Sequence, residues 1–433
     1  MVSCYGNIQL LKDRGLSMTT YNFDKITNRK GTNCLKYDFA VERGKPADVL
    51  PLWVADMDFP VSEEITKSLH AAVEHGIYGY TQPKDAYYNA VMNWMERNHN
   101  WKTEREWIVK TPGVVFALGA AVKAFTDPGD AILIQNPVYY PFTNIIRDND
   151  RRVVDNTLIY EKTAGQSGDN GYRIDFEDFE RKLEQEHIKL FILCNPHNPV
   201  GRVWTVEELQ QLGEICLRHH VIVVSDEIHN DFVYPGYEHT VFATVDPRFA
   251  EFTVTCTAPS KTFNLAGLQI SNIFIPNEKL RKAFQTEIDK TGYDEPNALG
   301  IVACEAAYRA GEDWLDQLRA YLLQNLNFLR EYLQEKIPQI HLVEPEGTYL
   351  VWLDCSELGI TGKELDQFIV DKAGLWLDGG SMFGPSGAAF QRVNIACPRA
   401  TLQLALDKLK TAVDSLKCGF GRFRETVPEN DIY

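Results

Sequence analysis

The sequence predicts an α/β protein in two parts, a large domain with a mainly parallel mixed sheet and a smaller α+β domain after it. Its 433 residues are too many for one small domain and suit two unequal ones. The middle of the chain alternates short apolar runs with amphipathic stretches, which is typical of βαβ units. From Trp314 to Leu333, apolar residues recur at helical spacing, which indicates one long helix.

Five apolar runs are expected to form strands of the large domain's sheet. They are Ala131–Ile134, Leu190–Cys194, Val221–Ser225, Phe252–Cys256 and Asn272–Ile275. The first three are continuously apolar, as strands covered by helices on both faces are. We therefore expect the sheet to lie in the interior of the domain.

Two helices are expected around these strands. Thr205 followed by Glu207 and Glu208 predicts a capped helix start with acids in the first turn, and this helix runs to about His219. Small residues favour a second helix over Phe116–Phe125.

The long helix ends before Pro338. We interpret it as a helix packed between the two domains, with a coiled coil as the alternative. A strand at Tyr349–Leu353, a helix from Gly362 to about Ala373 and a last helix from Arg399 are expected after it. The expected division is an N-terminal extension at 1–20, a segment at 21–60 that contributes to the small domain and the active site, a large domain at 61–299, an interdomain helix with the small domain at 300–416, and a tail at 417–433.

Composition excludes several classes of function. With 44 Lys and Arg against 60 Asp and Glu, the net charge is −16, which repels nucleic-acid backbones and anionic lipid. The nine cysteines are scattered and lack a CxxC pair, which favours a reduced cytoplasmic protein without a zinc site. No signal peptide is recognisable, and the apolar runs fall far short of the ~20 residues that span a bilayer. We expect no metal, nucleic-acid or membrane partner.

Four polar segments carry the chemistry. They are Asn195–Arg202, Ser225–His229, Ala258–Gly267 and Arg392–Ala396. Three of them follow directly after expected strands, and open α/β sheets bind ligands beyond the carboxyl ends of their strands. The sequence therefore predicts that these segments converge on one cleft.

Each segment supplies a group that a pyridine-aldehyde cofactor needs. Asp226 can pair with a protonated ring nitrogen, and Lys261 can form a Schiff base. Asn198 can donate a hydrogen bond to the ring's 3′-oxygen. Arg392 offers a planar fork for a substrate carboxylate.

Two further features fit the same ligand. Thr111–Val115 precedes the helix expected over Phe116–Phe125, and a helix N-terminus is a seat for phosphate. Tyr139 offers a flat aromatic face, although a plain core aromatic is the alternative for this residue.

Taken together, the chain resembles the fold-type I pyridoxal-phosphate (PLP) enzymes of the aminotransferase class I/II superfamily, from about Tyr21 to Leu416. Within them it most resembles the MalY/PatB-type cystathionine β-lyases, which are C–S lyases. The matching stretches are Leu52–Phe59, Tyr78–Thr81, Thr111–Val115, Ser225–His229 and Pro259–Gly267. Each is a weak signal, but their joint order and spacing are specific. The resemblance implies the aspartate-aminotransferase-like fold.

The resemblance also implies roles for single residues. Lys261, Asp226 and Tyr139 would be catalytic, and Arg392 with the backbone at Ala55 would hold the substrate carboxylate. The implied PLP-binding residues are Gly113, Val114, Val115, Tyr139, Asn198, Asp226, His229, Ser260, Lys261 and Tyr80. Of these, Tyr80 would reach the phosphate in the neighbouring subunit of a homodimer, with a core aromatic as its alternative.

Two positions depart from the general aminotransferase pattern. Gln269 stands where many of these enzymes have an arginine that binds the phosphate, and His229 stands where many have a tyrosine. Both fit the C–S lyase branch. They leave the cationic partner of the phosphate open, and Ser260 or the backbone beside Lys261 could contribute to binding it.

The implied reaction is αβ-elimination from a cysteine S-conjugate such as L-cystathionine, which yields a thiol, pyruvate and ammonia. The main rival is an aminotransferase, which needs the same residues but returns the proton to the cofactor. A further alternative is an added regulatory role as a protein that binds a transcription activator, since the MalY branch includes such a case.

Overall fold

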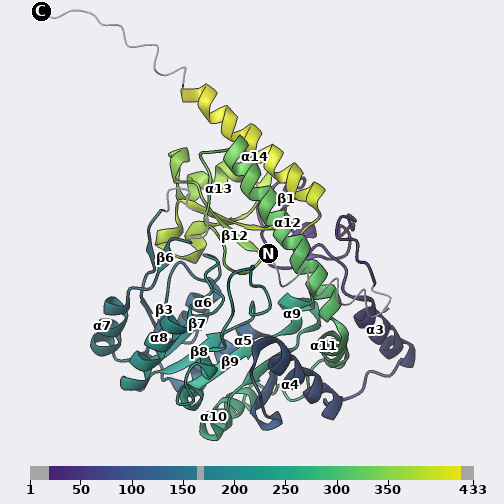
Figure 1. The fold of residues 1–433 in the computed structure, drawn as a ribbon, viewed down its shortest axis with the longest axis vertical. Coiled ribbons are helices and arrows are strands. Elements are labelled where there is room, and N and C mark those ends of the chain that lie inside the picture. The colour runs from purple at the N-terminus through teal and green to yellow at the C-terminus, as the bar shows by residue number, and fades with distance from the viewer. Residues whose placement is uncertain (1–18, 163–169, 421–433) are drawn as a thin grey trace, which may run out of the picture.

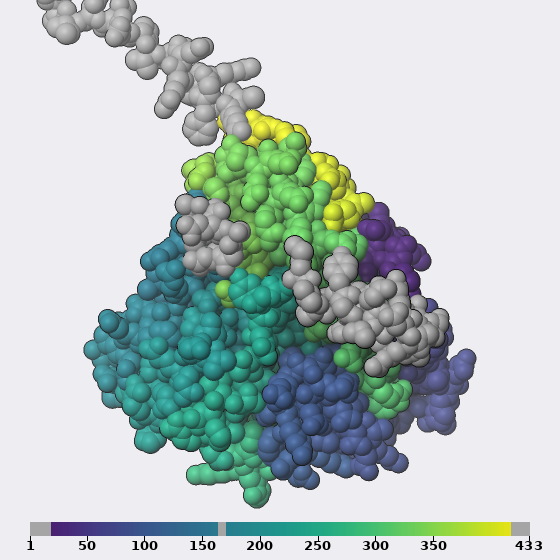
Figure 2. Space-filling model, viewed as in Figure 1, coloured from purple at the N-terminus to yellow at the C-terminus, as the bar shows by residue number. Residues whose placement is uncertain are grey.

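The computed structural model describes residues 19–162 and 170–420, so the expected N-terminal extension and C-terminal tail lie mostly outside it. Two lobes are visible, a large one around a central sheet and a smaller one beside it (Figure 1). Helix α12 (Glu312–Lys336) runs from one lobe to the other. Figure 2 shows the same two lobes as packed surfaces, teal and blue for the large one and mainly green and yellow for the small one.

The central sheet of the large lobe has seven strands. In spatial order they are β2 (Ile108–Thr111), β10 (Ser271–Phe274), β9 (Thr253–Thr257), β8 (Ile222–Asp226), β7 (Ile188–Cys194), β3 (Ala131–Ile134) and β4 (Arg152–Asp155). β10 is antiparallel to both of its neighbours, and all other adjacent pairs are parallel. The predicted mainly parallel mixed sheet is confirmed.

Alternating side chains of the strands enter two separate cores. On β3, Ala131 and Leu133 pack with α7 (Phe176–Glu186) and α8 (Val206–Arg218). Ile132 and Ile134 point to the opposite face and pack with α5 (Val114–Phe125), α6 (Pro141–Asp148) and α10 (Glu278–Asp289). Because both faces are covered, the strand is apolar along its whole length.

The helix starts follow from local chemistry. Thr205 caps α8 through a capping box with Glu208, as the sequence predicts. Helix α5 begins at Val114, two residues before the expected Phe116, because Gly113 serves as its N-cap. Val114 and Val115 therefore belong to the first turn, whose N–H groups have no partner within the helix.

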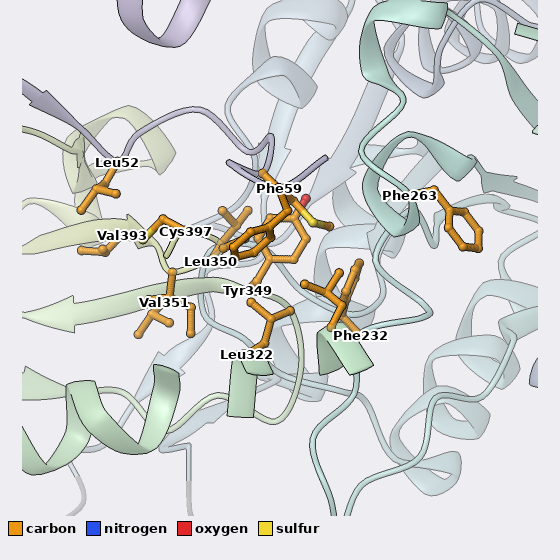
Figure 3. Close-up of a cluster of buried hydrophobic side chains, with 14 of the residues drawn as sticks. Leu52, Phe59, Phe232, Phe263, Leu322, Tyr349, Leu350, Val351, Val393 and Cys397 are labelled. Carbon is orange, nitrogen blue, oxygen red and sulfur yellow. The ribbon is translucent and has the colours of Figure 1, made fainter. Parts of the chain in front are cut away.

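The small lobe is built on an antiparallel sheet of β11 (His341–Leu342), β12 (Leu350–Asp354), β15 (Phe390–Asn394) and β14 (Asp378–Gly379). Helices α13 (Gly362–Asp371) and α14 (Arg399–Phe420) pack with it, at the expected positions. The N-terminal segment joins this lobe, since β1 (Leu50–Pro51) pairs with β13 (Leu375–Trp376). Leu52 and Phe59 of that segment share one buried cluster with Leu322 of α12 (Figure 3).

The remaining helices are α2 (Leu35–Asp38), α3 (Glu63–His75), α4 (Asp85–His99), α9 (Pro259–Thr262) and α11 (Ala298–Ala310), and β5 (Ile159–Tyr160) pairs with β6 (Tyr172–Arg173). α11 packs against α3 and α4 of the large lobe. Among the described residues, no helix combines the length and apolarity that crossing a membrane requires.

Candidate active site

A cavity of about 180 Å³ opens beyond the carboxyl ends of the central strands. It is lined by Ala55, Pro112, Gly113, Val114, Val115, Tyr139, Cys194, Asn198, Asp226, Ile228, His229, Ser260, Lys261, Ala266 and Ile270. The lining includes most of the residues that the sequence singled out. Gln269 is exposed and Tyr80 lies elsewhere, 96% exposed.

Three neighbouring parallel strands bring the principal groups together. β7 leads to Asn198, β8 ends on Asp226, and β9 leads into α9, which carries Lys261. Because these strands lie side by side, their ends deliver the three side chains to one edge of the sheet.

The amine of Lys261 is enclosed by protein. Its Nζ donates to the Ala55 carbonyl oxygen at 2.8 Å. Burial and, after it, the nearby Arg392 guanidinium lower the pKa of Lys261 to about 8, against the pull of Asp56 and Asp226. A substantial fraction of this amine is therefore neutral near physiological pH, as a nucleophile or base requires.

Asp226 is fully enclosed between strand ends. Burial raises the pKa of its carboxyl to about 7, although the Ile228 N–H and Lys261 pull in the other direction. Among the described residues, no cation forms an ion pair with this carboxyl, although Lys261 lies near enough to lower its pKa. A protonated ring nitrogen placed beside it would stabilise its charge.

His229 stands near Asp226 in the cavity wall. Burial, Lys261 and Arg392 hold the pKa of its imidazole well below the ordinary value, so the ring is neutral. Its Nδ1 is buried and has no hydrogen-bond partner among the described residues. Buried polar atoms rarely lack a partner, so an unpaired one on a residue of the cavity lining fits a ligand site.

Asn198 lines the cavity, and Arg392, which is buried and is not itself a lining residue, forms one polar unit with it. Arg392 Nη1 donates to Asn198 Oδ1 at 3.0 Å, which leaves the amide nitrogen of Asn198 as a donor for a ligand. The Arg392 guanidinium also lies 4.9 Å from the Phe383 ring centroid. Tyr139, whose N–H donates to the Asn198 carbonyl at 3.0 Å, presents its ring to the same cavity.

The far end of the cavity is formed by the start of α5. Gly113, Val114 and Val115 line it together with Ser260. The unpaired N–H groups of the first helical turn attract an anion such as phosphate. Among the described lining residues Lys261 is the sole cation. No other lining side chain therefore supplies the positive charge that an arginine at position 269 provides in many aminotransferases.

The structure also identifies contributors that sequence reasoning missed. Tyr349 donates to the Ala55 carbonyl at 3.0 Å, the same oxygen that Lys261 contacts. Asn394 holds the Val54 and Asp56 carbonyls at 2.6 Å each. Asn394 lies in the segment Arg392–Ala396, so its motif was visible, but its partners lie more than 300 residues away along the chain.

One cluster elsewhere could in principle hold a cation. Glu180, Glu184 and His219 lie within reach of one another near the surface. Arg218 and His219 already contact the Glu180 carboxylate. These contacts account for the cluster without a metal.

Comparison with known proteins agrees with this geometry. The family model for aminotransferase class I and II matches residues 47–409. The chain therefore belongs to the aminotransferase class I and II family, and the resemblance drawn from its motifs is confirmed.

Two curated relatives narrow the likeness to one branch. The chain is 46% identical to cystathionine β-lyase PatB of Bacillus subtilis, over 90% of this chain and 100% of that protein. It is 31% identical to protein MalY of Escherichia coli, over 92% of this chain and 100% of that protein.

Solved structures give the same result. Cystalysin from Treponema denticola, which contains a pyridoxal 5′-phosphate cofactor, superposes with a TM-score of 0.87 at 37% identity, over 92% of this chain and 100% of that chain. A PLP-bound C–S lyase from Staphylococcus hominis superposes with a TM-score of 0.84 at 35% identity, over 91% and 98% of the two chains.

Proposed function

We propose that this protein cleaves cysteine S-conjugates, L-cystathionine among them, by αβ-elimination to a thiol, pyruvate and ammonia. It is a PLP-dependent carbon–sulfur lyase of the aminotransferase class I and II family. The observation that carries the substrate proposal is the convergence of Lys261, Asp226 and Asn198 on one cavity, with Arg392 bonded to Asn198 outside the lining.

The cavity residues fit PLP. We assign Asp226 to the ring nitrogen, Asn198 to the 3′-oxygen and the Tyr139 ring to the face of the cofactor. The phosphate is assigned to the first turn of α5, at Gly113, Val114 and Val115, with Ser260 beside it, and His229 lines the ring. Bound there, PLP supplies the electron sink for the carbanion that forms at Cα.

Lys261 moves the proton. Its amine has a pKa of about 8, so it can accept the substrate's Cα proton at neutral pH. The Ala55 carbonyl that contacts Lys261 Nζ also accepts from Tyr349, which holds the acceptor in place. A positioned base of this kind contributes ~10²–10⁴-fold to the rate.

Arg392 binds the α-carboxylate of the substrate. A carboxylate only accepts hydrogen bonds, so the backbone group of Ala55 that can bind it is the N–H, whereas the carbonyl accepts from Lys261 and Tyr349. No described acceptor contacts that N–H. A guanidinium fork with one added N–H donor would orient Cα toward Lys261.

The molecule is proposed to act as a homodimer with shared sites. Tyr80 is 96% exposed, with Ile77 at 73% and Tyr78 at 59% in the same segment between α3 and α4. Such a row of exposed apolar side chains fits a surface that a second subunit covers, and Tyr80 is assigned to the second subunit's phosphate.

We also propose a cytoplasmic location. The cysteines whose side chains are described are all free, and most are buried. Reducing compartments keep thiols in this form.

The deciding experiment separates the lyase from an aminotransferase, which the family description keeps as the rival. The purified enzyme with PLP is incubated with L-cystathionine, and thiol and pyruvate are measured without any keto acid. The lyase should release both in equal amounts, and Lys261→Ala should abolish release. A requirement for 2-oxoglutarate, with glutamate accumulating and no thiol, would establish the aminotransferase instead.

A further inference from the structure

Arg392 has a partner that the expected role of this residue does not explain. It lies on β15 directly opposite Asp378 on β14, and both side chains are at least 95% buried. Arg392 Nη2 donates to Asp378 Oδ2 and to the Trp53 carbonyl oxygen, the latter at 3.0 Å. Nη1 donates to Asn198 Oδ1.

The donors of the guanidinium can be counted. A carboxylate binds bidentately along one of two edges, and both edges include Nη2, paired with either Nη1 or Nε. Nη2 has two N–H groups, and both are donated within the protein. Nε is buried and has no partner among the described residues. While Asp378, Trp53 and Asn198 all accept from Arg392, neither edge has both of its N–H donors free for a substrate carboxylate.

We propose that Asp378 is a built-in competitor for Arg392, which a substrate α-carboxylate must displace in order to bind. Its carboxylate occupies the position on Nη2 that one substrate oxygen would take. This inference rests on the proposed role of Arg392 in binding the substrate.

Of the two acceptors on Nη2, Asp378 is the one that the substrate displaces. The Trp53 carbonyl belongs to a residue whose indole stacks on Trp376 at 4.3 Å, next to the β1–β13 pairing. Asp378 uses a side chain that can rotate, and its negative charge repels an incoming carboxylate. Displacement leaves the Trp53 and Asn198 contacts intact, so the guanidinium keeps its orientation.

The consequence is selectivity for ligands that replace the charge of Asp378. A free carboxylate compensates the charge of Arg392 when the ion pair opens, whereas an ester or amide would leave the charges of both Arg392 and Asp378 unpaired. The competitor also weakens carboxylate binding overall, which favours release of the pyruvate product.

The test uses the holoenzyme and a ligand that cannot react. 3-(Methylthio)propionate has the thioether and carboxylate of a substrate but no amine, and its methyl ester is the uncharged counterpart. Their inhibition constants are measured against thiol release from L-cystathionine, and their binding is measured by calorimetry. Asp378→Asn should tighten binding of the acid about tenfold and leave the ester unchanged.

Asp366→Asn is the matched control. The Asp366 carboxylate lies next to Gly379 on the same sheet edge and accepts from Gln391 at 2.7 Å, but it does not contact Arg392. It should leave both constants unchanged. If Asp378→Asn does not fold, Asp378→Ser removes the same charge with a smaller side chain.

The outcomes are distinct. Unchanged or weaker binding of the acid in a folded Asp378 variant would overturn the proposal and would make Asp378 a residue that only positions Arg392. Arg392→Lys tests the underlying assignment, because loss of the fork should erase the preference for acid over ester. If that preference survives, the assignment of Arg392 fails, whatever Asp378 does, and the lyase activity is still tested separately by thiol and pyruvate release.

Discussion

Burial shifts the ionisation of three side chains in the cavity, each toward its neutral form. Lys261 has a pKa of about 8, Asp226 has a pKa of about 7, and His229 titrates well below its ordinary range. The common cause is loss of water, which disfavours the charged form of acids and bases alike. A cationic ring beside Asp226 would reverse the shift there.

The identity of the reactive lysine is directly testable. Reduction of the PLP-loaded protein with borohydride should bleach its visible absorbance and fix the cofactor on Lys261, the lysine whose Nζ lies in the cavity. Peptide mapping by mass spectrometry checks the position. A label on any other lysine would contradict the assignment.

The Asp226 carboxyl predicts a pH-dependent effect on the cofactor-free protein. Its pKa is raised from 3.8 to about 7 by folding, so the stability it contributes is present below pH 3.8 and is lost as the pH rises through 7. The full loss corresponds to roughly 4 kcal/mol. Asp226→Asn should therefore stabilise the cofactor-free protein at pH 8 and less so toward pH 4.

Urea denaturation at several pH values measures this difference. Asp148→Asn, which changes an exposed carboxylate on α6, is the control and should show little effect. With PLP bound, Asp226→Asn should instead lose most of its activity, since a neutral amide cannot hold the ring nitrogen protonated. If the unchanged protein and Asp226→Asn are equally stable without cofactor at pH 8, burial of the Asp226 carboxylate does not cost the expected free energy.

At the scale of elements, the strands that the sequence revealed are those buried on both sides. β3, residues 190–194 of β7 and residues 222–224 of β8 are continuously apolar, and all three strands lie inside the sheet. β2 and β4 were not predicted, and they are the two edge strands. An edge strand pairs on one side only, and residues such as Lys110 and Arg152 interrupt its apolar pattern.

The capping box of α8 predicts a local loss of stability. Thr205 Oγ1 accepts from the Glu208 N–H at 3.2 Å, and the Glu208 side chain accepts from the Thr205 N–H at 2.9 Å. Thr205→Ala should lower the free energy of unfolding by about 1 kcal/mol, because an N-terminal donor loses its partner. Thr361→Ala is the matched control, since Thr361 occupies the N-cap of α13 without a side-chain cap bond.

Thermal and urea denaturation measure both variants. Because α8 supplies no residue to the cavity lining, kcat should stay near that of the unchanged protein. Equal losses in both variants would show that the cap bond contributes nothing.

On the scale of the whole molecule, the N-terminal segment links the small lobe to the cavity. It pairs with β13, places Ala55 beside Lys261, and contributes Leu52 to the shared core. The cavity therefore depends on parts of the chain that lie far apart in sequence. The proposed homodimer would extend this dependence to a second subunit through the exposed Tyr80.

A mixed dimer tests the shared site. Tyr80→Ala and Lys261→Ala should each lower activity strongly, and co-expression of the two chains should restore part of it. Restoration is expected because one site of the mixed dimer receives Lys261 from one chain and Tyr80 from the other. Assays of the purified mixed dimer check this, and no recovery in a stable mixed dimer would contradict a site that takes Tyr80 from the second chain.

The sequence by itself determined the fold class, the inner strands, and the order of Asn198, Asp226 and Lys261 along the cavity edge. These features follow from local patterns, because burial sets the apolar runs and strand ends set where polar groups emerge. Only the tertiary structure decided which groups contact the site side chains. The contact of Lys261 with Ala55 spans 206 residues, and the pairing of Arg392 with Asp378 depends on the register of two strands. Neither separation nor register is encoded in a local pattern, since both depend on how the two lobes pack together.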